Sequence, residues 1–267
     1  MVKAIVAGAS GRMGKRIINV INNTKEIVLV GAFERNDHPD IGRDVGIVAG
    51  IGEIGIKIEP SLSKILEKGD VVIDFTTPKS TYNNIKLVAE KGIAMVIGTT
   101  GIHGNMLDEI VSIAKKIRCV MAPNMSIGVN VMFKIAHDIS KLLGNDYDTE
   151  IIELHHRFKK DAPSGTALRL AQIISASKGI KLDDVALYGR QGIIGERKKD
   201  EIGIHAVRAG DITGEHTIIF SSIGERLELT HKAHNRDNFA RGAVKAAIWV
   251  VNQTPGLYDM QDVLGLR

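Results

Sequence analysis

The sequence contains only one cysteine, Cys119, among its 267 residues. A single thiol cannot form an internal disulfide, and an unpaired cysteine is typical of proteins in a reducing compartment. Cys119 lies in the apolar run "RCVMAP" with no activating base beside it in the sequence, so we predict a buried core thiol rather than a reactive one. These features favour a cytoplasmic protein.

Aromatic residues, excess charge and long apolar runs are also scarce. Only 4% of residues are aromatic and the formal net charge is +4, which argues against nucleic-acid binding. Apolar runs such as "AIVAGA" are far shorter than the roughly 20 residues of a membrane-spanning helix. The first residues enter a strand pattern directly, without the features of a cleavable signal. We therefore expect a soluble globular protein with no nucleic-acid or membrane partner.

Over residues 2–124 the sequence alternates apolar β-type runs with amphipathic segments. The apolar runs predict strands at residues 2–9, 26–34, 70–76, 92–100 and 118–123. Between them, apolar residues three and four apart predict helices at residues 12–23, 61–69, 80–92 and 105–117. This alternation is typical of parallel βαβ units, so we predict an α/β fold with a doubly wound, Rossmann-like dinucleotide-binding domain.

A different pattern follows residue 126. It predicts a helix at residues 129–143, a strand in "YDTEIIELHH", a helix at residues 164–179, and β-structure at residues 202–210, 215–223 and 226–234, with a hairpin turn at Gly224 and Glu225. A last amphipathic helix at residues 238–253 has no further sheet beside it and is expected to pack on the first domain. We assign residues 1–126 and 236–267 to the dinucleotide-binding domain, and residues 127–235 to a second, mixed α+β domain.

The first predicted strand runs into "GASGRMG", which places Gly8, Gly11 and Gly14 at the start of a helix. Glycines there let the backbone approach a pyrophosphate, whose charge the free helix N–H groups stabilise. Such a turn alone is a weak signal. The second strand strengthens it, because Glu34 at its end suits the hydroxyls of the adenine ribose, and Arg35 suits a 2′-phosphate. The "GTTG" segment at residues 98–101 follows another strand at the same edge.

The stretch "ELHHRFKKDAPSGTA", residues 153–167, concentrates histidines and basic side chains before a small-residue turn. Geometry argues against a metal site, because neighbouring strand residues such as His155 and His156 point to opposite faces. A purely structural role for the imidazoles stays open. Ser164, Gly165 and Thr166 at a helix start offer hydroxyls and free amides to a carboxylate. The segment therefore predicts an anion site, at which His155 or Lys159 can supply a proton.

The sequence resembles the 4-hydroxy-tetrahydrodipicolinate reductase family, also called dihydrodipicolinate reductase, of the diaminopimelate route to lysine. The resemblance covers essentially the whole chain. It rests on "GASGRMG", "GTTG", "APNMSIGVN", "ELHHRFKKDAPSGTA" and "THKAHNRDNFARGA", in that order. Phe158 departs from the pattern, because a polar residue is expected there in some relatives.

The resemblance implies roles for particular residues of this chain. His155 and Lys159 are implied in proton donation, and His156, Gly165 and Thr166 in substrate binding, to which the turn adds Ser164. Contacts to NADH or NADPH are implied for Gly8, Ala9, Ser10, Gly11, Arg12, Met13, Glu34, Arg35, Gly98, Thr99, Thr100, Ala122, Pro123, Asn124 and Met125. No metal is implied.

The resemblance also implies a reaction and an assembly. The reaction is hydride transfer from the nicotinamide to an unsaturated ring carbon of a small cyclic dicarboxylate, followed by protonation. The assembly is a homotetramer formed through the second, substrate-binding domain. Two alternatives remain at this stage: another two-domain nicotinamide dehydrogenase, acting for example on a semialdehyde or a polyol, and a non-catalytic dinucleotide sensor.

Overall fold

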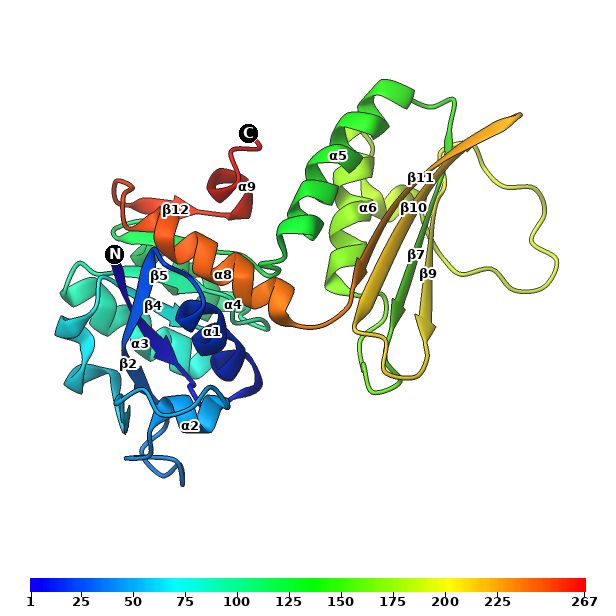
Figure 1. Ribbon diagram of the computed structural model, residues 1–267. Helices are drawn as coiled ribbons and strands as arrows, with labels where there is room; N and C mark the ends of the chain where they lie inside the picture. Colours follow the sequence, from blue (N-terminus) through cyan, green and yellow to red (C-terminus); the bar gives the residue numbers. More distant parts are fainter. The chain divides into compact units, whose positions relative to one another are not determined.

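The computed structural model describes all 267 residues and divides them into two compact units (Figure 1). Unit 1 comprises Met1–Ile127 and Arg236–Arg267, and unit 2 comprises Gly128–Asn235. The division falls one residue after the boundary expected from the sequence at residue 126. None of the helices is long and apolar enough to cross a membrane.

Unit 1 is built on a seven-stranded parallel sheet with the strand order β12-β6-β5-β4-β1-β2-β3. The chain moves outward from β1 in one direction and then returns to continue from β4 in the other, as a doubly wound fold requires. The strands are β1 (Val2–Ala7), β2 (Ile27–Phe33), β3 (Ile58–Glu59), β4 (Val71–Asp74), β5 (Ala94–Ile97), β6 (Arg118–Met121) and β12 (Gly256–Tyr258).

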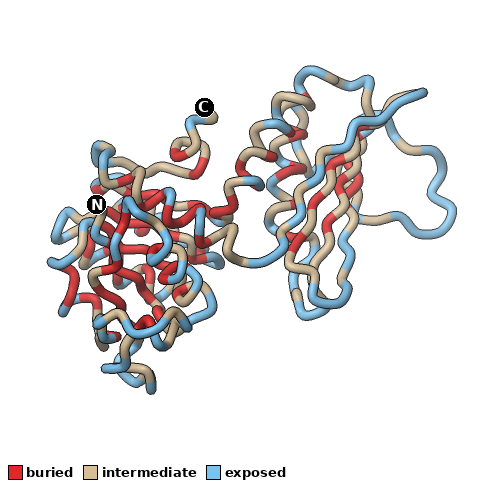
Figure 2. Tube along the Cα trace, viewed as in Figure 1, coloured by how far each residue is buried: buried red, intermediate tan, exposed pale blue.

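Both faces of this sheet are covered, and Figure 2 shows its strands as largely buried. Alternation along β1 illustrates this: Ala4 and Val6 belong to one core cluster, and Ile5 and Ala7 to the other. The first face packs against α1 (Arg12–Asn22) and α8 (Asp237–Val250), and the second against α3 (Pro78–Glu90) and α4 (Gly104–Ala114). Helix α8 thus packs on unit 1, as expected. Short helices α2 (Val45–Ala49) and α9 (Met260–Val263) complete the unit.

The expected helix at residues 61–69 is wrong in type. The segment forms two 3₁₀ turns, η1 (Leu62–Lys64) and η2 (Leu66–Lys68), separated by Ile65. Its apolar side chains Leu62, Ile65 and Leu66 are buried, so the spacing of apolar residues identified the buried positions correctly but not the type of helix. The segment is too short to propagate an α-helix before Gly69 continues extended into β4. The short edge strands β3 and β12 were not expected.

Unit 2 has a five-stranded mixed sheet with the order β11-β10-β7-β9-β8. Strand β7 pairs antiparallel with β10 and parallel with β9. The strands are β7 (Asp148–His155), β8 (Ala186–Tyr188), β9 (Ile202–Arg208), β10 (Gly214–Ser222) and β11 (Glu225–Ala233); the helices are α5 (Ile127–Leu143), α6 (Gly165–Ser177) and α7 (Leu182–Val185). This unit bears out the predicted mixed α+β class.

One face of this second sheet carries the core of unit 2. Ile151 of β7 and Ile218 of β10 pack there with Met132 of α5 and Leu170 of α6. Because side chains alternate along a strand, Glu153 and His155 lie on the same face as Ile151, at the end of β7 near which α6 begins. The β10–β11 hairpin pairs Ser222 with Glu225, so its turn is one residue earlier than expected from the sequence.

Candidate functional site

The turn from β1 into α1 has the close packing that a dinucleotide-binding loop needs. A Cβ atom added to Gly14 would lie 2.1 Å from the Gly8 carbonyl oxygen, so only glycine lets the helix approach the loop this closely. The amides of Gly8 and Ala9 donate to the Phe33 carbonyl oxygen, at 3.0 and 3.2 Å. These bonds tie the loop to the end of β2.

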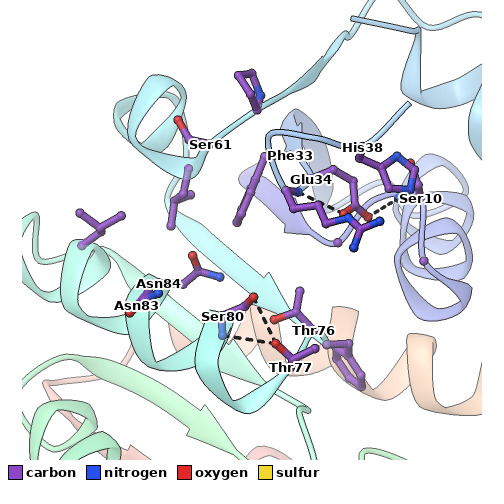
Figure 3. A pocket seen from close by; sticks show the side chains of 17 residues that line it. Ser10, Phe33, Glu34, His38, Ser61, Thr76, Thr77, Ser80, Asn83 and Asn84 are labelled. Carbon is purple, nitrogen blue, oxygen red and sulfur yellow. Dashed lines mark hydrogen bonds between the residues drawn. The ribbon is translucent and has the colours of Figure 1, made fainter. Parts of the chain in front are cut away.

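Glu34 lies directly after β2 and faces this loop. Its Oε1 accepts a hydrogen bond from the Ser10 amide at 3.1 Å (Figure 3). The Arg35 guanidinium, by contrast, is exposed and makes an ion pair only with the equally exposed Asp37, with Nε and Oδ1 3.2 Å apart. Exposed pairs of this kind contribute little free energy, so Arg35 can exchange Asp37 for a ligand phosphate.

A cavity of about 560 Å³ opens beside Glu34 and Arg35. Figure 3 shows Phe33, Ser61 and Asn83 around it, together with the start of α3 at Thr77 and Ser80. A mixed lining of apolar rings, hydroxyls and amides with one carboxylate and one guanidinium suits a nucleoside with ribose hydroxyls or a phosphate. The close-packed loop and the carboxylate therefore fit a dinucleotide.

Asp74, at the end of β4, was missed by the sequence analysis. Its carboxylate is fully buried and accepts hydrogen bonds from the side chains of Thr76, Thr81, Thr99 and Asn84, the shortest at 2.6 Å from Thr76. A buried carboxylate is stable only with such donors. Asp74 thus links the cavity wall at Thr76 to Thr99 of the "GTTG" segment. An aspartate ending an apolar strand in "VVIDFTTP" was the available signal.

Two further predicted cofactor segments follow β5 and β6, at the same edge of the sheet. Gly98 to Thr100 continue directly from β5, and Ala122 to Met125 from β6. Helix α8 packs against the second segment through Gly242, where an added Cβ would lie 1.7 Å from the Met125 carbonyl oxygen. Parallel strands bring all their carboxyl ends to one edge, so these segments and the Gly8 loop share that edge.

The second group of predicted residues lies in unit 2, where β7 ends. His155 is the last residue of the strand, and its Nδ1 lies 2.5 Å from Oε2 of Glu153. Glu153 is fully buried and also accepts hydrogen bonds from both terminal nitrogens of Arg208, at 2.8 and 2.7 Å. Neither Glu153 nor Arg208 was singled out as a site residue from the sequence. The cross-strand pairing of Arg208 with His155 explains their proximity.

The turn after the histidines leads into α6 at Ser164. The Ser164 amide donates to Oε1 of Glu153 at 2.9 Å, and its hydroxyl accepts from the Ala167 amide at 3.2 Å as the N-cap of α6. The same hydroxyl lies 3.0 Å from Nε2 of His216, a further residue that sequence reasoning missed. Ser164 is buried, and these two contacts give its hydroxyl internal partners.

Lys159 and Lys160 occupy different environments. The Lys159 Nζ lies 2.8 Å from Oδ2 of Asp161, and its side chain is only 20% exposed. Lys160 is exposed and makes no ion pair. His156 lies just beyond the end of β7, and its Nδ1 is buried with no protein partner. A buried imidazole nitrogen without a partner is what a polar ligand atom would satisfy.

The titration behaviour of this cluster follows from burial and from its charges. Burial lowers the pKa of His155, and nearby Lys159 and Arg208 lower it further, while the Glu153 carboxylate acts in the opposite direction. Burial alone would raise the pKa of Glu153, but the hydrogen bonds from Arg208, His155 and Ser164 keep it below its usual value. Burial lowers the pKa of His216 to about 3, so this ring is neutral at physiological pH.

The chain matches two family models that together cover nearly all of it. Residues 2–125 match "Dihydrodipicolinate reductase, N-terminus" and residues 128–264 match "Dihydrodipicolinate reductase, C-terminus". This chain belongs to the dihydrodipicolinate reductase family. The resemblance seen in the sequence is thereby confirmed.

Individual members of this family align with the chain over their full length. The chain is 54% identical to 4-hydroxy-tetrahydrodipicolinate reductase of Syntrophus aciditrophicus (strain SB) and 52% identical to that of Geotalea uraniireducens (strain Rf4), with 100% of both chains covered in each case. Among solved structures, dipicolinate-bound dihydrodipicolinate reductase from Paenisporosarcina sp. TG-14 is 27% identical with a TM-score of 0.75, covering 98% of each chain.

Other dehydrogenases share the fold at lower identity. A myo-inositol dehydrogenase from Corynebacterium glutamicum ATCC 13032 has a TM-score of 0.56 at 14% identity, covering 100% of this chain and 93% of that one. Such a likeness extends to the fold and carries no functional conclusion. The Rossmann-like class of unit 1 and the mixed sheet of unit 2 are both confirmed.

Proposed function

We propose that this protein catalyses the NAD(P)H-dependent reduction of 4-hydroxy-tetrahydrodipicolinate to tetrahydrodipicolinate in the diaminopimelate pathway of lysine biosynthesis. The observation that carries the proposal is the full-length match at 54% identity to a reductase of that name. The geometry supports it independently, because unit 1 has the features of a dinucleotide site and unit 2 has an imidazole and an ammonium beside a helix start.

In unit 1 we assign the cofactor to the carboxyl edge of the parallel sheet. The amides of the loop from Gly8 to Met13 would hold the pyrophosphate at the start of α1. Glu34 would bind the adenine-ribose hydroxyls of NADH, and Arg35 the 2′-phosphate of NADPH. The segments Gly98 to Thr100 and Ala122 to Met125 would contact the nicotinamide half. Asp74 supports this site indirectly, by holding Thr99 in place.

In unit 2 we assign the substrate to the start of α6. Two carboxylates on one ring need hydrogen-bond donors and positive charge. The exposed Gly165 and the neighbouring Thr166 offer backbone amides at the positive end of the helix dipole. His156 offers a buried ring nitrogen, and Lys159 a positive charge. Ser164 contributes by shaping the turn.

The chemistry needs a hydride and a proton at adjacent ring atoms. Bound NADH or NADPH supplies the hydride. Because 4-hydroxy-tetrahydrodipicolinate carries a hydroxyl group that tetrahydrodipicolinate lacks, this group leaves as water and creates an unsaturated bond in the ring. As the hydride enters one carbon of that bond, the electron pair of the bond moves to the neighbouring atom and takes a proton. The net change is the gain of a hydride and a proton and the loss of one water. His155 and Lys159 are the groups that we assign to deliver it, since His155 is half-buried and held by Glu153, and Lys159 lies in the same electrostatic cluster.

Location and assembly form a separate part of the proposal. A cytoplasmic location is supported by the single, unpaired cysteine, Cys119, because proteins of oxidising compartments typically pair their cysteines in disulfides. A homotetramer assembled through unit 2 is supported by exposed apolar side chains there, such as Ile194, Val207 and Leu227. Multi-angle light scattering of the purified protein would measure the mass, and a monomeric mass would overturn the tetramer.

The proposed reaction is tested by following cofactor oxidation with and without the cyclic dicarboxylate. We expect rapid oxidation of NADH and NADPH only when the substrate is present. A dinucleotide sensor would bind NADH without turnover. A different dehydrogenase would oxidise NADH with a semialdehyde or another carbonyl compound and ignore the dicarboxylate.

A further inference from the structure

The buried carboxylate of Glu153 connects two parts of the site in unit 2, the end of β7 with His155 and the start of α6. It contacts His155 on its own strand, Arg208 on β9 and the Ser164 amide at the start of α6. We propose that Glu153 is a positioning residue for the reduction. It fixes the ring of His155 with Nε2 toward the substrate, and it holds the turn that leads into α6 at Ser164 in a fixed position relative to that ring. This inference rests on the proposed function, and Glu153 itself need not touch the substrate.

The hydrogen bonds of Glu153 leave its carboxylate no capacity for a ligand. Its Oε1 accepts from Ser164 at 2.9 Å and from Arg208 at 2.7 Å, while its Oε2 faces Arg208 at 2.8 Å and His155 at 2.5 Å. An ionised carboxylate offers about four acceptor positions, so all of them are in use. A fully buried charge with a complete set of donors is stable in one geometry only.

This arrangement determines which nitrogen of His155 carries the proton that is available for transfer. The Glu153 carboxylate only accepts hydrogen bonds, so Nδ1 of His155 must carry a proton. The acidic proton that can leave is therefore the one on Nε2. An added Cβ on Gly214 would lie 3.0 Å from that Nε2, so the absence of a side chain at Gly214 leaves room beside it.

Glu153 holds the turn that leads into α6 through two sets of contacts. The Ser164 amide bond holds the start of α6 directly. Arg208, held by Glu153, also donates to the Asp161 carbonyl oxygen at 2.7 Å, and the Asp161 carboxylate in turn binds the Lys159 ammonium. One carboxylate thereby sets the positions of both groups assigned to proton delivery.

The electrostatic consequence is specific to Glu153. The charged or titratable groups around His155 are Glu153 on β7, Arg208 on β9, His216 on β10, and Lys159 in the turn. His216 is neutral, so Glu153 is the only anion among them. Without it, Arg208 and the Lys159–Asp161 ion pair remain around His155, so the pKa of His155 falls below its already lowered value.

The first test is Glu153→Gln, which keeps the size of the side chain and removes its charge. Activity that depends on protonated His155 declines as pH rises through its pKa, so in the variant this decline begins about one pH unit or more lower. At the pH of maximal wild-type activity kcat falls at least tenfold, while the affinity for NADH, bound by unit 1, is unchanged.

Glu150→Gln is the matched control. Glu150 lies on the same strand but on its other face, and it likewise accepts hydrogen bonds from arginines, Arg190 and Arg197, and from a histidine, His205. The control loses a comparable ion-pair network and is expected to lose stability. Its pH profile and kcat are expected to match the wild type. If both variants lower kcat equally without shifting the profile, Glu153 has only a structural role and the proposal is wrong.

A second measurement needs no variant and does not depend on activity. Imidazole nitrogen chemical shifts of the wild-type protein report which ring nitrogen of neutral His155 is protonated. We expect the Nδ1–H form, and an Nε2–H form would overturn the proposal even if Glu153→Gln fails to fold. Failure of reductase activity in the wild type would instead overturn the proposed function, with the tautomer result still standing.

Discussion

Replacement of Lys159 by alanine separates a specific site residue from a generally basic surface. The Lys159 side chain is mostly covered and lies in the turn that leads to α6, whereas Lys160 is exposed and makes no ion pair. If only a generally basic surface were needed, replacement of either lysine would lower turnover to the same extent. A positioned ammonium predicts that only one of them matters.

The magnitude follows from the two roles assigned to Lys159. Loss of a positioned acid or base typically costs 10²- to 10⁴-fold in rate, so we expect Lys159→Ala to lower kcat at least about a hundredfold. The ion pair with Asp161 involves a carboxylate that is 62% exposed, and such pairs contribute about 0–1 kcal/mol. The variant should therefore remain folded, and its melting temperature should stay close to that of the wild type.

The assay is steady-state turnover with the cyclic dicarboxylate, combined with NADH affinity by fluorescence titration. Lys159→Ala is expected to lose turnover and keep NADH affinity, because NADH is assigned to unit 1. Lys160→Ala is expected to retain turnover within about twofold, the scale of a minor surface change. Full activity in Lys159→Ala, or equal losses in the two variants, would refute the assignment.

Three further changes test other contacts. Arg35→Ala should weaken NADPH binding by about 1–3 kcal/mol more than NADH binding, because the lost contact is charge-assisted; equal losses would show that Arg35 does not bind the phosphate. Asp161→Asn should weaken dicarboxylate binding up to about fivefold in calorimetry, since Lys159 loses the carboxylate that holds its ammonium in place; tighter binding would show that Asp161 instead competes with the ligand for Lys159. His216 has its pKa lowered to about 3, so the unfolded chain binds its proton more readily, and stability is lost as pH falls from about 6.5 towards 3. Between about pH 7 and pH 5 this costs roughly 2 kcal/mol, and denaturant titration of His216→Gln should show a correspondingly smaller loss than the wild type; identical losses would contradict a neutral buried ring.

The sequence was sufficient for the elements that have a strong local signal. Alternating apolar runs located the strands β1, β2, β4, β5 and β6 of unit 1. The edge strands β3 and β12 escaped prediction, because two or three residues carry no periodicity. The segment at residues 61–69 has helical spacing but forms 3₁₀ turns, since burial of Leu62, Ile65 and Leu66 is compatible with both.

The site shows the same division between local and long-range information. His155 and Lys159 could be named from one segment, because the segment itself contains the turn and the helix start. Arg208 and His216 could not, since they meet Glu153 and Ser164 only through strand pairing and packing, 55 and 52 residues away along the chain. Asp74 was missed for a similar reason: its donor Thr99 lies 25 residues further on.

Reduction of the cyclic dicarboxylate with a nicotinamide cofactor can be measured on the purified protein. The most direct measurement is the oxidation of NADH and NADPH by the purified protein when freshly prepared 4-hydroxy-tetrahydrodipicolinate is added, with product identified by mass spectrometry. We expect one equivalent of tetrahydrodipicolinate for each cofactor oxidised, and almost no oxidation without the substrate. Binding of NADH with no substrate-dependent oxidation would contradict the proposed function.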